Sequence, residues 1–302
     1  MSPGRLQRAQ GLTSAELEAV AELEARVLAV DGGRLKLEWN TLRGRPGTAV
    51  EDLLWWAGDQ LVGFCGLYAF GPPAIEVVGM VEPAWRRHGI GTALLDAALD
   101  VVGDRGMGPM LLVVPGPSTG GHALAARRGA VIEHSEHALV LDGMPGHMER
   151  DTEITLRVAM ADDAPVVARL LAAGFGHAPD HPFARLMVDT GRTLLIERGG
   201  DALGTVRITH DGGVGGVYGF AIDPAHQGQG IGRDVLARVC RQLRDEGARR
   251  VQLEVAVDNE RALDLYLSLG FTRTQTEDYY EMPPTSSATA SPNRPPSPRG
   301  VQ

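Results

Sequence analysis

The stretch AIDPAHQGQGIGRDVL, residues 221–236, decides the fold of this chain. It packs three glycines into the five positions 228–232, between a strand-like run and a segment with helical periodicity. Glycine adopts backbone angles that other residues avoid and lets a bulky group approach the backbone closely. The first amides of a helix have no partner within the helix. This order of elements therefore predicts a backbone cradle for an anion, such as a pyrophosphate, at the helix N-terminus.

A second stretch, MVEPAWRRHGIGTALL at residues 80–95, has proline and glycine residues at nearly the same spacing. Gly89 lies 141 residues before Gly230. The same offset relates further turn residues: Pro83 and Pro224, Gly106 and Gly247, and Gly129 and Gly270. The chain is therefore an internal duplication, and its two copies keep one register from the glycine turns onward.

Both copies predict the same order of elements. An amphipathic helix comes first, with Ser14 as its expected cap in one copy and Asp162 or Asp163 in the other. Strands are expected at 52–57, 61–70, 75–81, 110–114 and 137–142, and again at 193–197, 202–210, 217–222, 251–257 and 278–283. Further helices are expected at 90–102, 119–128, 231–246 and 259–269. The fold class is α/β, a mixed sheet with helices on both faces.

The duplication also predicts the domain organisation. We expect an N-terminal domain over residues 1–145 and a C-terminal domain over residues 151–283, joined by DGMPGHMERDTE at 142–153. Residues 284–302 are rich in proline and serine and poor in apolar residues, so we expect a disordered tail.

Composition narrows the class of protein. Of the 302 residues 43% are hydrophobic and 22% charged, and no apolar run is long enough to span a membrane or form a signal core, so we expect a cytoplasmic protein. The net charge of −9 disfavours a nucleic-acid partner. Cys65 and Cys240 lie in apolar segments and are expected in the core, and the scattered histidines predict no metal site.

The spacing of the glycine turn excludes two nucleotide motifs. It differs from the dinucleotide motif GxGxxG, and no lysine follows the last glycine as in a P-loop. A purely structural tight turn is the alternative to an anion site.

The glycine turn and the sequence around it resemble the GNAT superfamily of acetyl-CoA-dependent N-acetyltransferases, whose signature [RQ]-x-x-G-x-[GA] fits Gln227, Gly230 and Gly232. The downstream run LEVAVDNERALDLYLSLGF, residues 253–271, resembles the second signature of that family.

The resemblance implies two tandem GNAT folds, each a mostly antiparallel sheet with a splayed central parallel pair. It also implies that acetyl-CoA is the co-substrate and that the C-terminal domain binds it. The residues expected to contact acetyl-CoA are Phe220, Ala221, Ile222, Gln227, Gly228, Gln229, Gly230, Ile231, Gly232, Arg233 and Asn259.

Two further side chains are predicted to be catalytic. Tyr266 stands where the family places the acid that protonates the departing thiol. Glu254 lies inside an apolar strand but on the opposite face from its apolar neighbours, and a carboxylate there needs a partner or a task. Its pairing with Tyr266 is similar to that of ribosomal-protein N-terminal acetyltransferases, which implies that Glu254 is the base. The alternatives are an ion pair of Glu254 with Arg249 or Arg261, and packing alone for Tyr266.

The first copy keeps the cradle but not these two groups. At the offset of 141 residues, Val113 takes the place of Glu254 and Ala125 that of Tyr266. We expect a degenerate domain, with Glu76 either a substitute base or an ordinary charged strand residue. A possible second cofactor site comprises Arg86, Arg87, Gly89, Ile90 and Gly91.

The sequence therefore predicts an acetyl-CoA-dependent N-acetyltransferase that acts on a primary amine by direct attack in a ternary complex. A non-catalytic acyl-CoA sensor is one alternative. Another is acetylation of a cysteinyl-sugar conjugate, because the chain resembles mycothiol synthases, although Gly216 stands where those enzymes carry an acidic residue. The acceptor stays open among small amines and peptide N-termini, and so does the choice between monomer and homodimer.

Overall fold

The fold is that of a computed structural model, which describes residues 4–70, 74–146, 151–175, 181–189 and 192–283. Twelve strands form one mixed sheet in the order β1-β2-β3-β4-β5-β12-β6-β11-β10-β9-β8-β7. The strands of the first copy are β1 (Arg5–Ala9), β2 (Asp52–Ala57), β3 (Gln60–Tyr68), β4 (Ile75–Val81), β5 (Met110–Pro115) and β6 (Val131–Leu141). Those of the second copy are β7 (Ile154–Val158), β8 (Arg192–Arg198), β9 (Asp201–Asp211), β10 (Val214–Ile222), β11 (Arg250–Ala256) and β12 (Thr272–Glu281).

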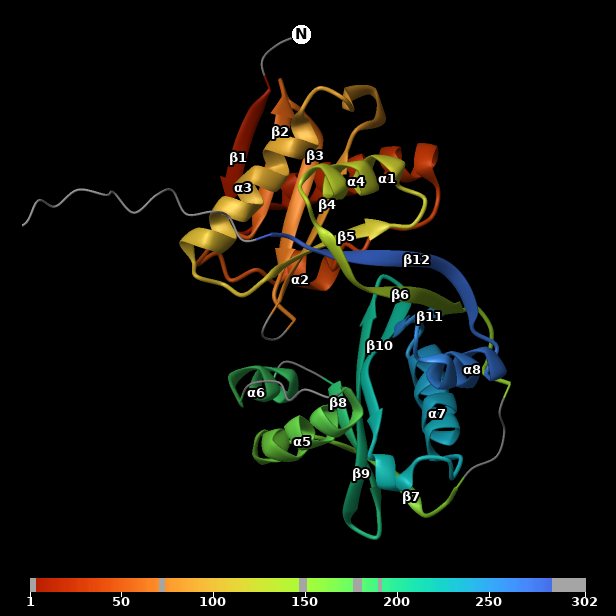
Figure 1. Ribbon diagram of the computed structural model, residues 1–302. Coiled ribbons are helices and arrows are strands. Elements are labelled where there is room, and N and C mark those ends of the chain that lie inside the picture. The colour runs from red at the N-terminus through yellow and green to blue at the C-terminus, as the bar shows by residue number, and fades with distance from the viewer. Residues whose placement is uncertain (1–3, 71–73, 147–150, 176–180, 190–191, 284–302) are drawn as a thin grey trace, which may run out of the picture.

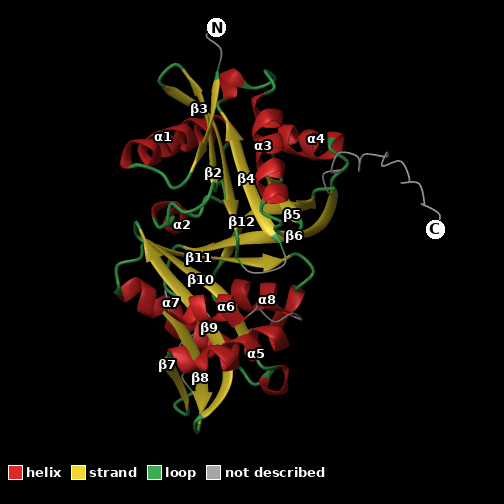
Figure 2. Ribbon diagram, turned by 90° about the vertical axis from the view of Figure 1, so that its left-hand side faces the viewer, coloured by secondary structure: helices red, strands yellow, loops and turns green. Residues whose placement is uncertain are grey.

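Helices cover both faces of the sheet in each half (Figure 2). The first half carries α1 (Ser14–Asp31), α2 (Trp39–Arg43), α3 (Ile90–Asp104) and α4 (Thr119–Arg127). The second half carries α5 (Ala164–Phe175), α6 (His181–Asp189), α7 (Ile231–Asp245) and α8 (Glu260–Ser268). Apolar clusters fill the space between these helices and the sheet, and both Cys65 and Cys240 are buried in them as expected.

The expected elements are present with adjusted bounds. The helix cap of α1 is Thr13, not Ser14, because Thr13 and Glu16 form a reciprocal capping box. Asp163 accepts a hydrogen bond from the Met160 amide, 2.7 Å long, at the turn before α5. The sequence analysis missed the short elements β1, β7, α2 and α6. It also began β6 and β12 six residues too late, because the first residues of both strands are polar or exposed.

The last strands of the two halves are exchanged (Figure 1). β12 lies between β5 and β6 and is antiparallel to both, while β6 pairs with β11. Each half therefore completes its sheet with a strand of the other half, and the sheet does not divide at the linker between the copies.

The central parallel pair of each half is splayed. β10 pairs with β11 only through Val214–Gly216, and β4 pairs with β5 only through Ile75–Val77. Beyond Tyr218, an irregularity interrupts the register of β10 with β9, and Gly219 takes a φ of 51° there. The end of β10 is thereby left facing the opening between the strands.

The exchange predicts that a change near the C-terminus weakens the first half. Met282 is 4% exposed, packs in the core of the first half and donates its amide to the Met110 carbonyl oxygen at 2.9 Å. Met282→Ala should cost about 2–5 kcal/mol of unfolding free energy, as for other buried large-to-small changes. Hydrogen exchange should show faster opening of β5.

Met160→Ala is the matched control, because Met160 is 64% exposed. Unchanged protection of β5 in a destabilised Met282→Ala protein would contradict the coupling between the halves.

Candidate active site

A cavity of about 760 Å³ opens in the second half beside the splayed strands. It is bounded by the glycine turn, the end of β10, the middle of β11 and the helix α8. All but one of the residues predicted as cofactor-binding or catalytic line it: Phe220, Ala221, Ile222, Gln227, Gly228, Gly230, Ile231, Gly232, Arg233, Glu254, Asn259 and Tyr266. Gln229 lies outside it and accepts a hydrogen bond from Arg198 at 3.4 Å.

The glycine turn has the conformation that the sequence analysis required. Gly228 and Gly230 take φ angles of 79° and 82°, in the left-handed region that disfavours residues with a Cβ. Gly230 is the N-cap of α7 and offers no side chain to the first amides of that helix. A Cβ built on Gly230 would meet no atom within 4 Å, so the turn leaves open space in front of these amides. This arrangement suits a pyrophosphate.

The first residue of each glycine motif holds the turn on its strand. Gln227 donates from Nε2 to the carbonyl oxygen of Ile222 at 2.9 Å and accepts from Arg261 at 3.0 Å. In the first half, Arg86 donates from Nε to the equivalent carbonyl oxygen, that of Val81, at 3.1 Å. The side chain of Gln227 therefore positions the turn, and the backbone of the turn faces the cavity.

Asn259 also has a structural task at the cavity wall. Its Oδ1 accepts the amide of Ala262 at 3.1 Å and so caps α8. Ser118 does the same in the first half, accepting the amide of Gly121 at 3.2 Å. The cap fixes the start of the helix that carries Tyr266.

Tyr266 lines the cavity and is 7% exposed. Burial raises the pKa of its phenol to about 12. Its ring contacts Phe271 with 6.1 Å between the ring centroids. Tyr266 is therefore a neutral phenol at physiological pH, which is the form that donates a proton.

Glu254 is ion-paired, but with neither of the arginines that the sequence analysis considered. Arg34 donates to its Oε1, and the Nζ of Lys36 lies 3.2 Å from its Oε2. Both cations belong to the first half. Burial would raise the pKa of Glu254, yet Lys36 and Arg34 outweigh burial and lower it to about 2.

These contacts are part of a larger group on one face of the sheet, which we call the charged cluster. Its members are Arg34, Lys36, Glu38, Glu76, Glu136, Glu254, Glu277 and Tyr279. Glu136 comes from β6 of the first half and lines the cavity of the second. Sequence reasoning singled out Glu76 but missed its place beside Glu254 and missed the other neighbours. The one available signal was the alternation of Arg34, Lys36 and Glu38 with Leu35 and Leu37.

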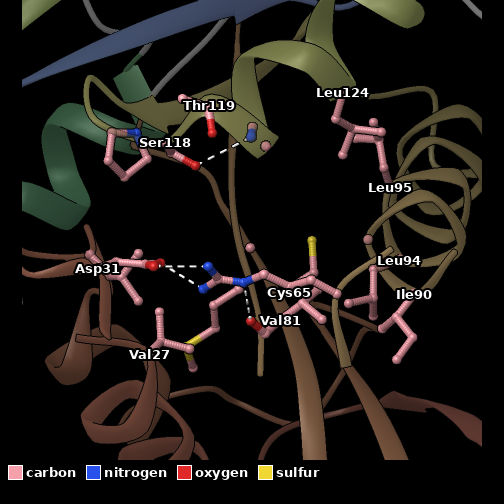
Figure 3. A pocket seen from close by; sticks show the side chains of 18 of the residues that line it. Val27, Asp31, Cys65, Val81, Ile90, Leu94, Leu95, Ser118, Thr119 and Leu124 are labelled. Atoms are coloured by element: carbon pink, nitrogen blue, oxygen red, sulfur yellow. Dashed lines mark hydrogen bonds and ion pairs between the residues drawn. The ribbon is translucent and has the colours of Figure 1, made fainter. Parts of the chain in front are cut away.

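The first half has its own cavity of about 570 Å³ at the equivalent place (Figure 3). Arg86, Arg87, Gly89, Ile90 and Gly91 all line it. Both Nη atoms of Arg86 are bound by the carboxylate of Asp31, at 2.8 and 2.6 Å. Glu76, the possible substitute base, does not line this cavity and lies 3.0 Å from the Nζ of Lys36. The first half thus retains a cradle without a proton donor at the position of Tyr266.

Comparison with known proteins agrees with this geometry. The model of the Acetyltransferase (GNAT) family matches residues 17–130 and 166–271, one match in each half. The chain belongs to the GNAT family. It is an N-acetyltransferase with tandem GNAT folds, as the sequence analysis predicted.

Relatives of this GNAT protein match along nearly its whole length. A mycothiol acetyltransferase of Kineococcus radiotolerans is 33% identical and covers 88% of this chain and 93% of its own. A mycothiol acetyltransferase of Streptomyces avermitilis is 30% identical, and the match covers 93% of this chain and 92% of the relative. Among solved structures, a GCN5-related N-acetyltransferase from Sphaerobacter thermophilus has a TM-score of 0.76 at 22% identity, covering 93% and 96%. A tandem GNAT protein from the clavulanic acid biosynthesis pathway has a TM-score of 0.67 at 19% identity, covering 92% and 98%.

Two features are absent from the described residues. None of the helices there is long and apolar enough to cross a membrane. Within the same ranges, no three His, Cys, Asp or Glu side chains gather as a metal site would require.

Gly216 of this GNAT protein has no room for a larger side chain. A Cβ there would lie 2.5 Å from Oγ1 of Thr209 and 2.5 Å from the ring of Tyr218. Tyr218 therefore occupies the space next to the position at which an acidic residue is expected in mycothiol synthases.

The glycine turns generate a prediction about strain. Arg87 takes a φ of 66°, whereas the equivalent residue of the second half is Gly228. Because a left-handed conformation costs a residue with a Cβ roughly 1–2 kcal/mol, Arg87→Gly should raise the free energy of unfolding by about 1 kcal/mol. Gly228→Ala should lower it by a similar amount. Urea unfolding measures both, and a loss of stability in Arg87→Gly would show that contacts of its side chain outweigh the strain.

Proposed function

We propose that the second half binds acetyl-CoA in its cavity and acetylates a primary amine there, while the first half carries no chemistry of its own. The observation that supports this most is that one cavity connects the glycine turn with Tyr266 and Glu254. A pure acyl-CoA sensor would not need a neutral buried phenol and an ionised carboxylate on the same wall.

The residues present fit acetyl-CoA. The free amides at the start of α7 and the side chain of Arg233 would hold its pyrophosphate. The open edge of β10 at Phe220, Ala221 and Ile222 would take the pantetheine arm, because the splay leaves this edge unpaired toward β11. Bound there, acetyl-CoA supplies the thioester whose acetyl group is transferred.

Tyr266 is the proposed acid of the reaction. A neutral amine nitrogen forms a bond with the acetyl carbonyl carbon, and the carbon–sulfur bond breaks. Tyr266 gives its phenolic proton to the departing sulfur, and the proton that the nitrogen sheds restores the phenol through solvent. No net proton is stored on the protein in this scheme.

Glu254 is proposed to receive the amine. With a pKa of about 2 it is a weak proton acceptor at neutral pH, but as a fixed carboxylate it accepts a hydrogen bond from the amine and orients its lone pair. The role of general base, expected from the sequence, stays a prediction that the same variant tests. We infer that the rate depends on the acceptor's own amine pKa, because only the neutral amine attacks.

For the acceptor we propose the amine of a cysteinyl amino-sugar conjugate. This rests on the two mycothiol acetyltransferases that are 30% and 33% identical over most of this chain. Because Gly216 stands where an acidic residue is expected in mycothiol synthases, this chain would contact the acceptor differently at that position.

Tyr266→Phe tests the acid role. Loss of a positioned proton donor should lower kcat about 10²–10⁴-fold with little change in the KM of acetyl-CoA. The product is quantified by mass spectrometry, because an acceptor thiol would interfere with detection of free coenzyme A.

Tyr280→Phe is the control, because Tyr280 pairs with His122 of the first half at 2.9 Å and does not line the cavity. Equal turnover of Tyr266→Phe and the unchanged enzyme would reject the acid role.

Glu254→Gln tests the receiving carboxylate. If Glu254 only orients the amine, the variant should lower kcat/KM for the acceptor and keep the same pH dependence. A lost acid limb in the pH profile would instead assign Glu254 as the base.

An amine panel tests the acceptor class. Cysteinyl-glucosamine amide should be acetylated with a higher kcat/KM than glucosamine, spermidine or an alanyl peptide. A panel without a preference for the cysteinyl compound would overturn this acceptor and leave the transferase proposal intact.

A further inference from the structure

The segment between α1 and α2 carries the first half's charges to the cavity of the second. Arg34, Lys36 and Glu38 alternate with Leu35 and Leu37 in this segment, and Lys36 is only 8% exposed. Gln275 of β12 fixes the segment through two hydrogen bonds of 3.1 Å, one from the Arg34 amide and one to its carbonyl oxygen. The charges therefore reach Glu254 on a backbone that is held in place.

Each carboxylate oxygen of Glu254 has its own cation. Arg34 binds Oε1, and it also binds Glu277 through two hydrogen bonds of 3.0 and 2.8 Å. Lys36 lies 3.2 Å from Oε2 of Glu254 and donates to the hydroxyl of Tyr279 at 2.5 Å. Tyr279 in turn donates to Glu136 at 2.6 Å. Neither cation can rotate away from Glu254 without breaking a second buried contact.

We propose that Arg34 and Lys36 are positioning residues for acetyl transfer, which hold Glu254 ionised and oriented at the wall of the other half's cavity. This inference rests on the proposed function of that cavity. It gives the first half a specific task in a reaction that takes place in the second.

Glu38, another carboxylate of the charged cluster, shows how burial affects the pKa of a glutamate that has no cation in contact among the described residues. Glu38 forms no ion pair with the part of the chain that the structure describes, and burial together with Glu254 raises its pKa to about 7 in spite of Lys36. Glu254 is in the same surroundings with two cations in contact, and its pKa falls to about 2. A Glu254 without Arg34 and Lys36 would take up a proton far more readily and present a neutral acid to the amine.

Other titratable groups face Glu254 from every neighbouring element. They are Glu38 on the segment before α2, Glu76 on β4, Glu136 on β6, Tyr218 on β10, and Glu277 and Tyr279 on β12. All of these groups are neutral when protonated and become negative when they lose a proton. Arg34 and Lys36 are thus the two cations in the cluster that oppose protonation of Glu254.

The test observes Glu254 directly, in the full chain. Glutamate labelled with ¹³C at the side-chain carboxyl is followed by NMR from neutral into acid pH, and Glu254→Gln assigns the resonance. In the unchanged protein we expect no titration of Glu254 within this range. In Lys36→Met and in Arg34→Gln the midpoint should rise by about 1–3 pH units, the effect of removing an opposite charge in contact.

Arg43→Gln is the matched control. Arg43 also joins the halves, through an ion pair with Asp211, but it is exposed and does not contact Glu254. Arg34→Lys keeps the charge and should keep Glu254 ionised. Since Lys36→Met could unfold the protein, the half-buried Arg34 is changed in parallel and both variants are checked by circular dichroism.

Kinetics separate this inference from the proposed function. In Arg34→Gln, kcat/KM for cysteinyl-glucosamine amide should fall at acid pH more than at neutral pH, while the KM of acetyl-CoA stays constant. An unshifted Glu254 resonance in folded variants would overturn the positioning role even if the enzyme acetylates the amide. Failure of the unchanged enzyme to acetylate any amine would reject the proposed function, and the positioning role with it.

Discussion

The pairing of β6 with β12 is the contact on which the rest of the molecule depends. It places a strand of each half inside the sheet of the other, so that the two cores share one continuous layer of hydrogen bonds. It also determines the site. Glu136 reaches the second cavity on β6, while Glu277 and Tyr279 bring the charged cluster together on β12. Two copies joined only by a linker would have neither arrangement.

The electrostatics follow from this topology. Five carboxylates gathered on one buried face of a sheet repel one another and would take up protons. Arg34 and Lys36 enter from a loop and direct their charge mainly to Glu254, so one carboxylate is strongly ionised while Glu38 titrates near neutrality. Tyr266, which α8 carries, meanwhile stays neutral at the wall of the same cavity. An anion from β11 and a neutral acid from α8 thus face one cavity.

Much of this could be read from the sequence because its causes are local. The glycines at 228 and 230 must adopt positive φ, and alternation alone places Glu254 opposite Leu253 and Val255. The partners of Glu254 could not be predicted, because Arg34 is 220 residues away and reaches it only through the exchanged strands. The motif specifies the residue type at Gln227 but not its contacts, and the bond of its side chain to the Ile222 carbonyl oxygen could be seen only in the structure. Its contact with the cofactor stays a prediction.

The exchange of strands also bears on the history of the duplication. Because each copy depends on the other for a strand, deletion of either copy would remove a strand from its neighbour's sheet. The first copy has Ala125 and Val113 where the second has Tyr266 and Glu254, yet its strands still complete the shared sheet. The segment between α1 and α2 also ties the first half to the second, because its side chains contact Glu254. If the first half carries no chemistry, as proposed, its strand in the other half's sheet is a physical reason for it to be retained.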